Sequence, residues 1–200
     1  MPINKLRATP RAKALIASIV AVSIGGYVAI FPGQPKVHDD VALAIKTAMP
    51  WEGRSLVAYF DRIAKPPVWT ICDGDTDDVR PGMVETPAGC DQRTAMKMEK
   101  RFRPALVSCV TNWGHQPLAW RGMILSLSWN IGTGAACHSS AVRIVNDAVR
   151  LNAEPDYIAS CNAATAFNKA GNRVRVGLVN RREMGDATRV GEGELCVSGL

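Results

Sequence analysis

An uncharged run near the N-terminus limits what the first part of this chain can become. No charged side chain lies between Lys13 and Lys36, and the apolar part of this run covers residues 14–31. As a helix rising ~1.5 Å per residue, those positions span about 27 Å, close to the ~30 Å hydrocarbon layer of a bilayer. Many of them are Ala, Ser or Gly, which gain little from contact with lipid. The run therefore predicts a membrane helix that is held only weakly.

The charges that flank the run predict its orientation. Four Lys and Arg residues precede it, whereas Asp39 and Asp40 follow it closely. By the positive-inside rule the N-terminus stays in the cytoplasm and the rest of the chain is exported. A cleaved signal peptide is the alternative. Against it, the run is longer than a usual signal-peptide core, and no small-residue cleavage site stands just before Pro32.

Six cysteines agree with export, because all of them lie beyond the apolar run and their number is even. They allow 15 pairings in principle. A zinc site is the rival interpretation, but the chain has no C-x-x-C, and His115 and His138 have no ligand spacing. We expect disulfides and no metal site. The cysteines are Cys72, Cys90, Cys109, Cys137, Cys161 and Cys196.

Pro32, Gly33 and Pro35 form a hinge that divides the chain into an N-terminal segment, residues 1–37, and one domain, residues 38–200. The chain carries a net charge of +6. Such a charge suits nucleic acid, anionic lipid or an acidic wall polymer, or it simply solvates the surface. Export excludes nucleic acid as a partner.

The domain reads as mostly helical with a small sheet. Its first helix is capped by Asp39 or Asp40 and ends near Pro50, and residues 53–85 have the punctuated pattern of an antiparallel sheet. A helix then runs from Thr86 toward Val110, with a break near Pro104. Further helices are predicted from Gln116 to about 131 and over 139–150, 155–168 and 177–188. We predict an α+β fold with a cleft between two lobes.

Three polar residues follow at equal spacing, namely Glu52, Asp61 and Thr70. Their surroundings read WEGRSLVAYFD (51–61) and VWTICDGDT (68–76), and later come WNIG (129–132), FNKAG (167–171) and GLVNRRE (177–183). In these motifs the chain resembles the phage lysozymes of glycoside hydrolase family 24, in their signal-anchor-release endolysin branch, over residues 38–196. The resemblance implies a two-lobed lysozyme-like fold.

The resemblance also assigns roles at a glycosidic bond, whose hydrolysis needs an acid for the leaving oxygen and a carboxylate for the cationic sugar centre. Glu52, beside Trp51 at a helix end, is the acid. Asp61 stays ionised and orients the attacking water, and Thr70 helps to hold that water. In this chain the connection between Asp61 and Thr70 is longer than in the family pattern, so Thr76 is the alternative hydroxyl.

For other residues near the motif, the functional interpretation is less definite. Tyr59 and Ser140 are candidates for binding the glycan. The acids Asp73, Asp75 and Asp77 suggest a calcium loop, but they lack the glycine and glutamate that an EF-hand needs, so a solvated turn is the preferred interpretation. We prefer the disulfide Cys72–Cys90, because both cysteines flank the sheet, and then Cys109–Cys137 and Cys161–Cys196.

The expected function is that of a muramidase that cuts the MurNAc–GlcNAc bond of bacterial peptidoglycan during host-cell lysis, without a cofactor and as a monomer. Residues 14–31 would hold it at the inner membrane, with its catalytic domain in the periplasm, until release. In some relatives a cysteine of the anchor switches activity on, but here the first cysteine is Cys72. Two other classes remain open: a non-catalytic, membrane-anchored wall-binding protein and a membrane-permeabilising lysis protein.

Overall fold

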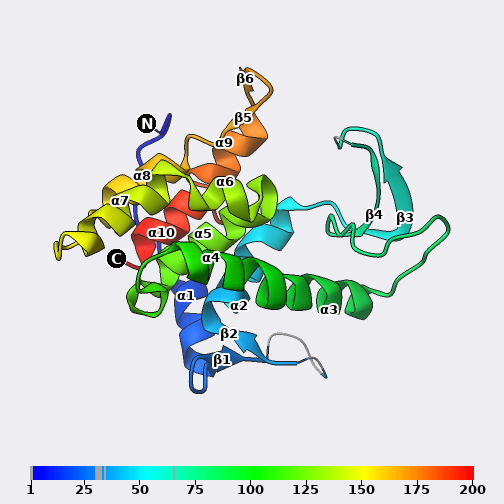
Figure 1. Ribbon diagram of the computed structural model, residues 1–200, viewed down its shortest axis with the longest axis horizontal. Coiled ribbons are helices and arrows are strands. Elements are labelled where there is room, and N and C mark those ends of the chain that lie inside the picture. The colour runs from blue at the N-terminus through cyan, green and yellow to red at the C-terminus, as the bar shows by residue number, and fades with distance from the viewer. Residues whose placement is uncertain (1, 30–32, 34, 65) are drawn as a thin grey trace.

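A buried helix organises the larger part of the molecule. The computed structural model describes residues 2–29, 33, 35–64 and 66–200, and α5 (Leu118–Ile131) lies at the centre of its helical body (Figure 1). Helices α2 (Asp39–Ala48) and α10 (Glu192–Ser198) pack directly against it. A Cβ on Gly122 would lie 2.9 Å from the side chain of Leu43, so glycine at this position allows α2 and α5 to approach closely.

The remaining helices complete the body, and several match the predicted boundaries. The predicted break before Pro104 is present as a π-helical segment at Met98–Phe102, and Pro104 lies in the first turn of α4, where its missing N–H is tolerated. Short 3₁₀ turns cover Met49–Trp51 and Trp113–His115. The other helices are α3 (Pro87–Lys97), α4 (Arg103–Cys109), α6 (Thr133–Cys137), α7 (Ser140–Arg150), α8 (Tyr157–Ala164) and α9 (Val176–Arg182).

The C-terminal part differs from the sequence prediction. The helix expected over 177–188 is α9, which ends at Arg182 because Glu183 leaves helical geometry and Gly185 has a φ of +70°. A loop of residues 183–191 then leads to α10, which was not predicted. The loop is tied to α10 by the Glu194 carboxylate, which accepts a hydrogen bond of 3.1 Å from the Gly191 amide.

A smaller lobe stands apart from the body, on the right in Figure 1, and consists of the antiparallel strands β3 (Ser55–Asp61) and β4 (Val68–Cys72). Its own small core contains Ala58, Ile71 and the half-cystines Cys72 and Cys90. The Cys72–Cys90 disulfide joins this lobe to α3. The lobe is thereby tied to the helical body behind it.

The cysteines pair in the predicted combination. Cys109–Cys137 connects α4 to α6, and Cys161–Cys196 connects α8 to α10. Each bond joins elements that are far apart in sequence, so each restricts the unfolded chain and typically adds ~2–4 kcal/mol.

The N-terminal segment forms two elements rather than the single long helix expected over 14–31. Helix α1 (Pro10–Val22) ends in a turn in which Gly25 and Gly26 have φ values of +60° and +81°, and β1 (Tyr27–Val28) then pairs with β2 (Val37–His38). Residues 30 and 31 of the expected helix lie outside the described residues. Within the described ranges, no helix combines the length and apolar character needed to cross a bilayer.

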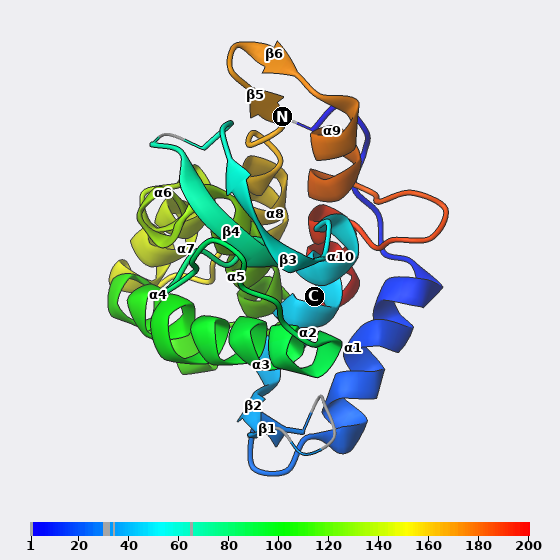
Figure 2. The same ribbon diagram turned by 90° about the vertical axis from the view of Figure 1, so that its right-hand side faces the viewer.

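Helix α1 packs against the outside of the body, beside α2 and α10 (Figure 2). Only Ala12 and Ile19 of this helix are buried. Before it, residues 2–9, here called the N-terminal arm, cross the surface of α8 and α10. The fold also carries a third, projecting hairpin formed by β5 (Lys169–Ala170) and β6 (Arg173–Val174).

Candidate active site

Glu52 lies where the helical body passes into the hairpin lobe. It caps the 3₁₀ turn that follows α2, and its side chain is 21% exposed. One carboxylate oxygen accepts a hydrogen bond of 2.8 Å from Nη1 of Arg181 on α9. Glu52 is therefore open to an incoming group on one side and ion-paired on the other.

Arg181 is a site residue to which sequence reasoning gave no role, although it stands in the quoted GLVNRRE motif. Its side chain is 4% exposed, and its Nε lies 3.3 Å from the carboxylate of Glu192. Burial opposes its charge, but the neighbouring carboxylates of Glu192 and Glu52 outweigh burial and raise the pKa of Arg181. Arg181 therefore remains a cation that links Glu52 to α10. Its Nη2 has no hydrogen-bond partner among the described residues.

Asp61 ends strand β3 at the tip of the hairpin. Its carboxylate accepts hydrogen bonds from the amides of Ile63 at 2.8 Å and Ala64 at 3.3 Å. These bonds fix the start of the turn. The predicted role of Asp61 stays a prediction.

The strand register brings Tyr59 and Thr70 onto the face that carries Asp61. Tyr59 and Asp61 are two positions apart on β3, and Thr70 is the cross-strand partner of Tyr59. Thr70 is 3% exposed, and its hydroxyl lies 3.4 Å from the carbonyl of Val68. Thr70 is thus buried, whereas its neighbour Tyr59 is 42% exposed.

Tyr59 connects the two carboxylates electrostatically. Burial raises the pKa of the Tyr59 phenol, and the negative charges of Asp61 and Glu52 raise it further. Both charges therefore act on one phenol, and Thr70 is the cross-strand neighbour of that residue. We take Glu52, Asp61, Tyr59 and Thr70 as the candidate site residues.

Ser140 does not belong to this cluster by its contacts. It begins α7, is exposed, and its hydroxyl lies 3.4 Å from Arg143 on the same helix. Its predicted contact with the glycan stays a prediction. Thr76, the alternative hydroxyl, is exposed in the turn after β4.

The acids that suggested a calcium loop are engaged in ion pairs. Asp73 pairs with Arg54 at 2.8 Å, and Asp75 pairs with Arg93 and Lys97 at 2.6 Å each. Burial opposes the charge of Asp75, but Lys97 and Arg93 lower its pKa. These acids stabilise the junction between the hairpin lobe and α3.

The loop of residues 183–191 covers the turn that carries Glu52. The guanidinium of Arg189 lies 3.9 Å above the ring of Trp51, and the indole N–H of Trp51 donates to the carbonyl of Val190 at 3.1 Å. Both contacts restrict the residue immediately before Glu52. The position of this loop therefore helps to decide where Glu52 lies.

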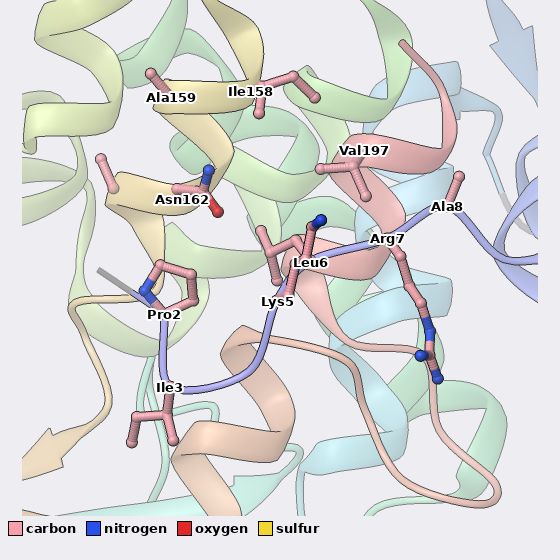
Figure 3. A pocket seen from close by; sticks show the side chains of 11 residues that line it. Pro2, Ile3, Lys5, Leu6, Arg7, Ala8, Ile158, Ala159, Asn162 and Val197 are labelled. Atoms are coloured by element: carbon pink, nitrogen blue, oxygen red, sulfur yellow. The ribbon is translucent and has the colours of Figure 1, made fainter.

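Two buried acids, Glu183 and Glu194, hold the N-terminal arm and the start of α1. Glu183 accepts hydrogen bonds from the amides of Ile3 and Asn4 at 2.7 Å. Glu194 accepts a hydrogen bond from Thr9 and pairs with Arg11 of α1 at 2.7 Å. Between the arm and helices α8 and α10 lies an open, largely apolar cavity of about 900 Å³ (Figure 3). None of the candidate site residues lines this cavity.

The chain resembles known phage endolysins in sequence and in fold. The chain is 27% identical to the SAR-endolysin of Enterobacteria phage P21 over 152 residues, which are 74% of this chain and 78% of that protein. Its fold resembles that of the endolysin from Escherichia coli O157:H7 phage FAHEc1, with a TM-score of 0.60, 21% identity and coverage of 79% and 92% of the two chains.

A third similarity extends into the N-terminal segment. The crystal structure of the active form of the P1 phage endolysin Lyz matches with a TM-score of 0.56 and 19% identity, over 97% of each chain. Residues 49–185, which include Glu52, Asp61, Thr70 and Arg181, match the sequence profile of the phage lysozymes. The chain therefore belongs to the phage lysozyme family.

Proposed function

We propose that the chain is a muramidase that hydrolyses the glycosidic bond between MurNAc and GlcNAc in bacterial peptidoglycan. The observation that carries this proposal is the position of Glu52, which is partly exposed where the helical body passes into the β3–β4 lobe that carries Asp61. Membership of the phage lysozyme family supports a glycoside hydrolase acting on peptidoglycan. Two carboxylates on either side of a polymer are what this reaction requires.

In this mechanism Glu52 protonates the leaving oxygen and Asp61 orients the attacking water, which the Thr70 hydroxyl helps to hold. In the structure Glu52 is bound to Arg181 at 2.8 Å. Proton transfer therefore requires a substrate that enters beside Glu52 and weakens this contact while excluding water. Arg181 can accommodate that change, because Glu192 continues to neutralise it.

The test is digestion of purified cell wall by wild type and Glu52→Gln, followed by mass spectrometry of the fragments. We expect new reducing ends at muramic acid and a 10²–10⁴-fold loss of rate in the variant. Glu154→Gln, which changes an exposed glutamate before α8, should keep wild-type activity. Freed peptides in place of glycan fragments would identify an amidase. Full lysis by Glu52→Gln would favour a non-catalytic wall-binding protein.

We also propose that residues 14–31 hold the newly made protein in the inner membrane and that the structure corresponds to the released form in the periplasm. Two features support this. Residues 23–29 leave the helix through the Gly25–Gly26 turn, and α1 buries only Ala12 and Ile19 against the body. A segment that is weakly held in lipid and weakly packed on the protein can exchange between the two.

A chain of contacts would couple release to activity. Arg11 donates hydrogen bonds to the carbonyls of Asp186 at 2.5 Å and Met184 at 2.8 Å, in the loop of residues 183–191. The same loop places Arg189 over Trp51, next to Glu52. While the N-terminal arm and Arg11 are on the cytoplasmic side of the membrane, the loop of residues 183–191 lacks the hydrogen bonds from Arg11. Glu52 is then less well placed.

Dissipating the membrane potential with an ionophore tests the release step. The wild-type chain should move from the membrane pellet to the soluble fraction, because loss of the potential lowers the cost of extracting the helix. Gly25→Leu should delay this transfer, because leucine favours lipid and does not fit a φ of +60°. A protein that still sediments with membranes after the potential is lost would refute release. We expect the released enzyme to act as a monomer.

A further inference from the structure

The β5–β6 hairpin is a cationic projection without counter-charges. Residues 169–177 are all exposed, and they include Lys169, Arg173 and Arg175. Within the described part of the chain, none of these three side chains forms an ion pair or a hydrogen bond. No Asp or Glu occurs anywhere in residues 157–182. The hairpin therefore presents three free positive charges in a region that contains no acid of its own.

Other cations of the fold are paired. Near α3, the cations Arg93 and Lys97 pair with Asp75, and Arg101 pairs with Asp77. Six residues beyond Arg175, Arg181 is buried against Glu52 and Glu192. The three cations of the hairpin lack such partners among the described residues and lie together on one short projection. A merely solvated surface would be expected to carry both signs of charge.

The hairpin leads directly into the helix that contacts the catalytic acid. Arg175 caps the start of α9, and Arg181 near its end holds Glu52. At ~1.5 Å per residue, this places Arg175 about 9 Å along the helix from Arg181. In both views the tip of the β3–β4 hairpin and the β5–β6 hairpin extend toward the same end of the molecule (Figures 1 and 2). The β3–β4 tip contributes another exposed cation, Arg62.

We propose that Lys169, Arg173 and Arg175 bind the carboxylates of the peptide stems that branch from the glycan strand. This rests on the proposed muramidase function and names the part of the substrate that the hairpin recognises. The N-acetylated sugars at the cleavage site are neutral in their rings, whereas the stems carry carboxylates, which pair well with Arg and Lys. Val174 and Val176, 48% and 76% exposed, offer apolar contact to the alkyl parts of a stem.

The surface of an anionic membrane is the other chemistry that could attract this charge. We favour peptide stems because the three cations lie just before α9, the helix whose Arg181 binds Glu52. A glycan strand bound at Glu52 therefore brings its own peptide branches to these cations. Hairpin and cleft would then bind the same polymer at two points, and this raises its effective concentration at the site.

The experiment compares two soluble substrates, glycan strands with intact stems and the same strands after an amidase has removed the stems and the lactyl carboxylates thereby exposed have been converted to neutral amides. The hairpin variant carries Lys169→Gln, Arg173→Gln and Arg175→Gln. The control carries Lys13→Gln, Lys36→Gln and Lys100→Gln, which remove equal charge from exposed positions elsewhere. The hairpin variant should have a KM about tenfold higher for stem-bearing glycan, with kcat unchanged, if each of three exposed pairs contributes a few tenths of a kcal/mol or more.

For stripped glycan, the wild type, the hairpin variant and the control should have the same KM, and the wild-type advantage on stem-bearing glycan should fall with added salt. Equal losses on both substrates, or an equal loss in the control, would overturn the proposal. The proposal would also be overturned if the wild type sedimented with phosphatidylglycerol vesicles and the hairpin variant did not. If the wild type cuts neither substrate, the muramidase proposal itself fails. If it cuts both and the hairpin variant matches it, only the role of the hairpin is refuted.

Discussion

Helices α1 and α2 lie side by side but are held in different ways. Eight of the ten residues of α2 are buried, and the helix packs along α5 through Leu43 and Gly122. In α1 only Ala12 and Ile19 are buried. Its further attachment comes from Arg11 and Thr9, which bind Glu194 at one end of the helix.

The difference shows how one chain can contain a permanent element and a detachable one. Hydrophobic burial scales with the apolar area removed from water, so α2 cannot leave without opening the core. The attachment of α1 combines Ile19 and the partly buried Leu15 and Ile16 with polar contacts at one end, so its loss exposes less of the core than loss of α2 would. Such an attachment is compatible with the proposed exchange between membrane and protein.

The largest effect is expected at the polar attachment of α2. Asp40 is fully buried and accepts hydrogen bonds from Arg103 at 2.9 Å, Trp113 at 2.8 Å and Arg121 at 2.5 Å. Asp40→Asn leaves the Arg103 guanidinium without a counter-ion and leaves Arg121 with only the more distant Asp39 at 3.6 Å, and it should lower the free energy of unfolding by ~3–5 kcal/mol. Chemical denaturation measures this loss, and a cost below ~1 kcal/mol would show that α2 is not fixed in this way.

The same substitution in the two helices sharpens the comparison. Ile45 in α2 and Ile19 in α1 are 2% and 3% exposed. Ile45→Ala should cost ~3–5 kcal/mol in global unfolding, whereas Ile19→Ala should cost ~2 kcal/mol or less, because α1 can detach while the body stays folded. Hydrogen exchange checks this, since Ile19→Ala should reduce protection in α1 alone. Equal global destabilisation by both would contradict a detachable α1.

Arg11→Gln weakens the end attachment without touching the apolar face of α1. Glu194 is fully buried at its side chain, so loss of its cationic partner should cost ~1–2 kcal/mol in docking of the segment. We expect lower activity of the released enzyme, with normal transfer out of the membrane. Lys13→Gln, at the next exposed position of α1, is the matched control. Unchanged activity of Arg11→Gln would break the proposed coupling through the loop of residues 183–191.

The smallest effect concerns pH. Burial opposes the charge of Glu194, but hydrogen bonds from Arg11, Thr9 and Gly191 outweigh it and lower its pKa below the usual 4.5. A lowered carboxyl pKa contributes stability that is complete above pH 4.5 and is lost as the pH falls through the folded-state value. The difference in Tm between wild type and Arg11→Gln should therefore be constant from pH 7 to 5 and shrink below pH 4.5. A difference that grows in acid would contradict this assignment.

Much of the domain could be predicted because local signals and tertiary structure agree. Thr86 with Pro87 marks the start of α3, and its hydroxyl accepts the Gly89 amide as a cap should. The two-stranded lobe follows from the short punctuated runs around Tyr59 and Thr70. The motif around Glu52 and Asp61 indicated the candidate acids, but the ion pair that Glu52 forms with Arg181 appears only in the fold.

Other features were beyond sequence reasoning. Glu183 and Glu194 bind the N-terminal arm about 180 residues away in sequence, and no local pattern encodes such a pairing. Arg181 was visible in its motif but received no role, because its contact with Glu52 spans 129 positions. Helix α10 was missed because Glu192 and Glu194 are buried in ion pairs, where a sequence pattern assigns charged residues to the surface.

The sequence by itself determined the family, the order of most helices and the small antiparallel lobe, because these depend on motifs, periodicity and turn residues close together in the chain. The same motifs predicted the candidate acids. Only the tertiary structure decided that the apolar N-terminal run ends as a helix at Val22 and packs beside α2 and α10. That run has a composition suited to lipid or to a protein surface. Its packing on the protein depends on the buried acids Glu183, just after α9, and Glu194 of α10, which lie at the far end of the chain.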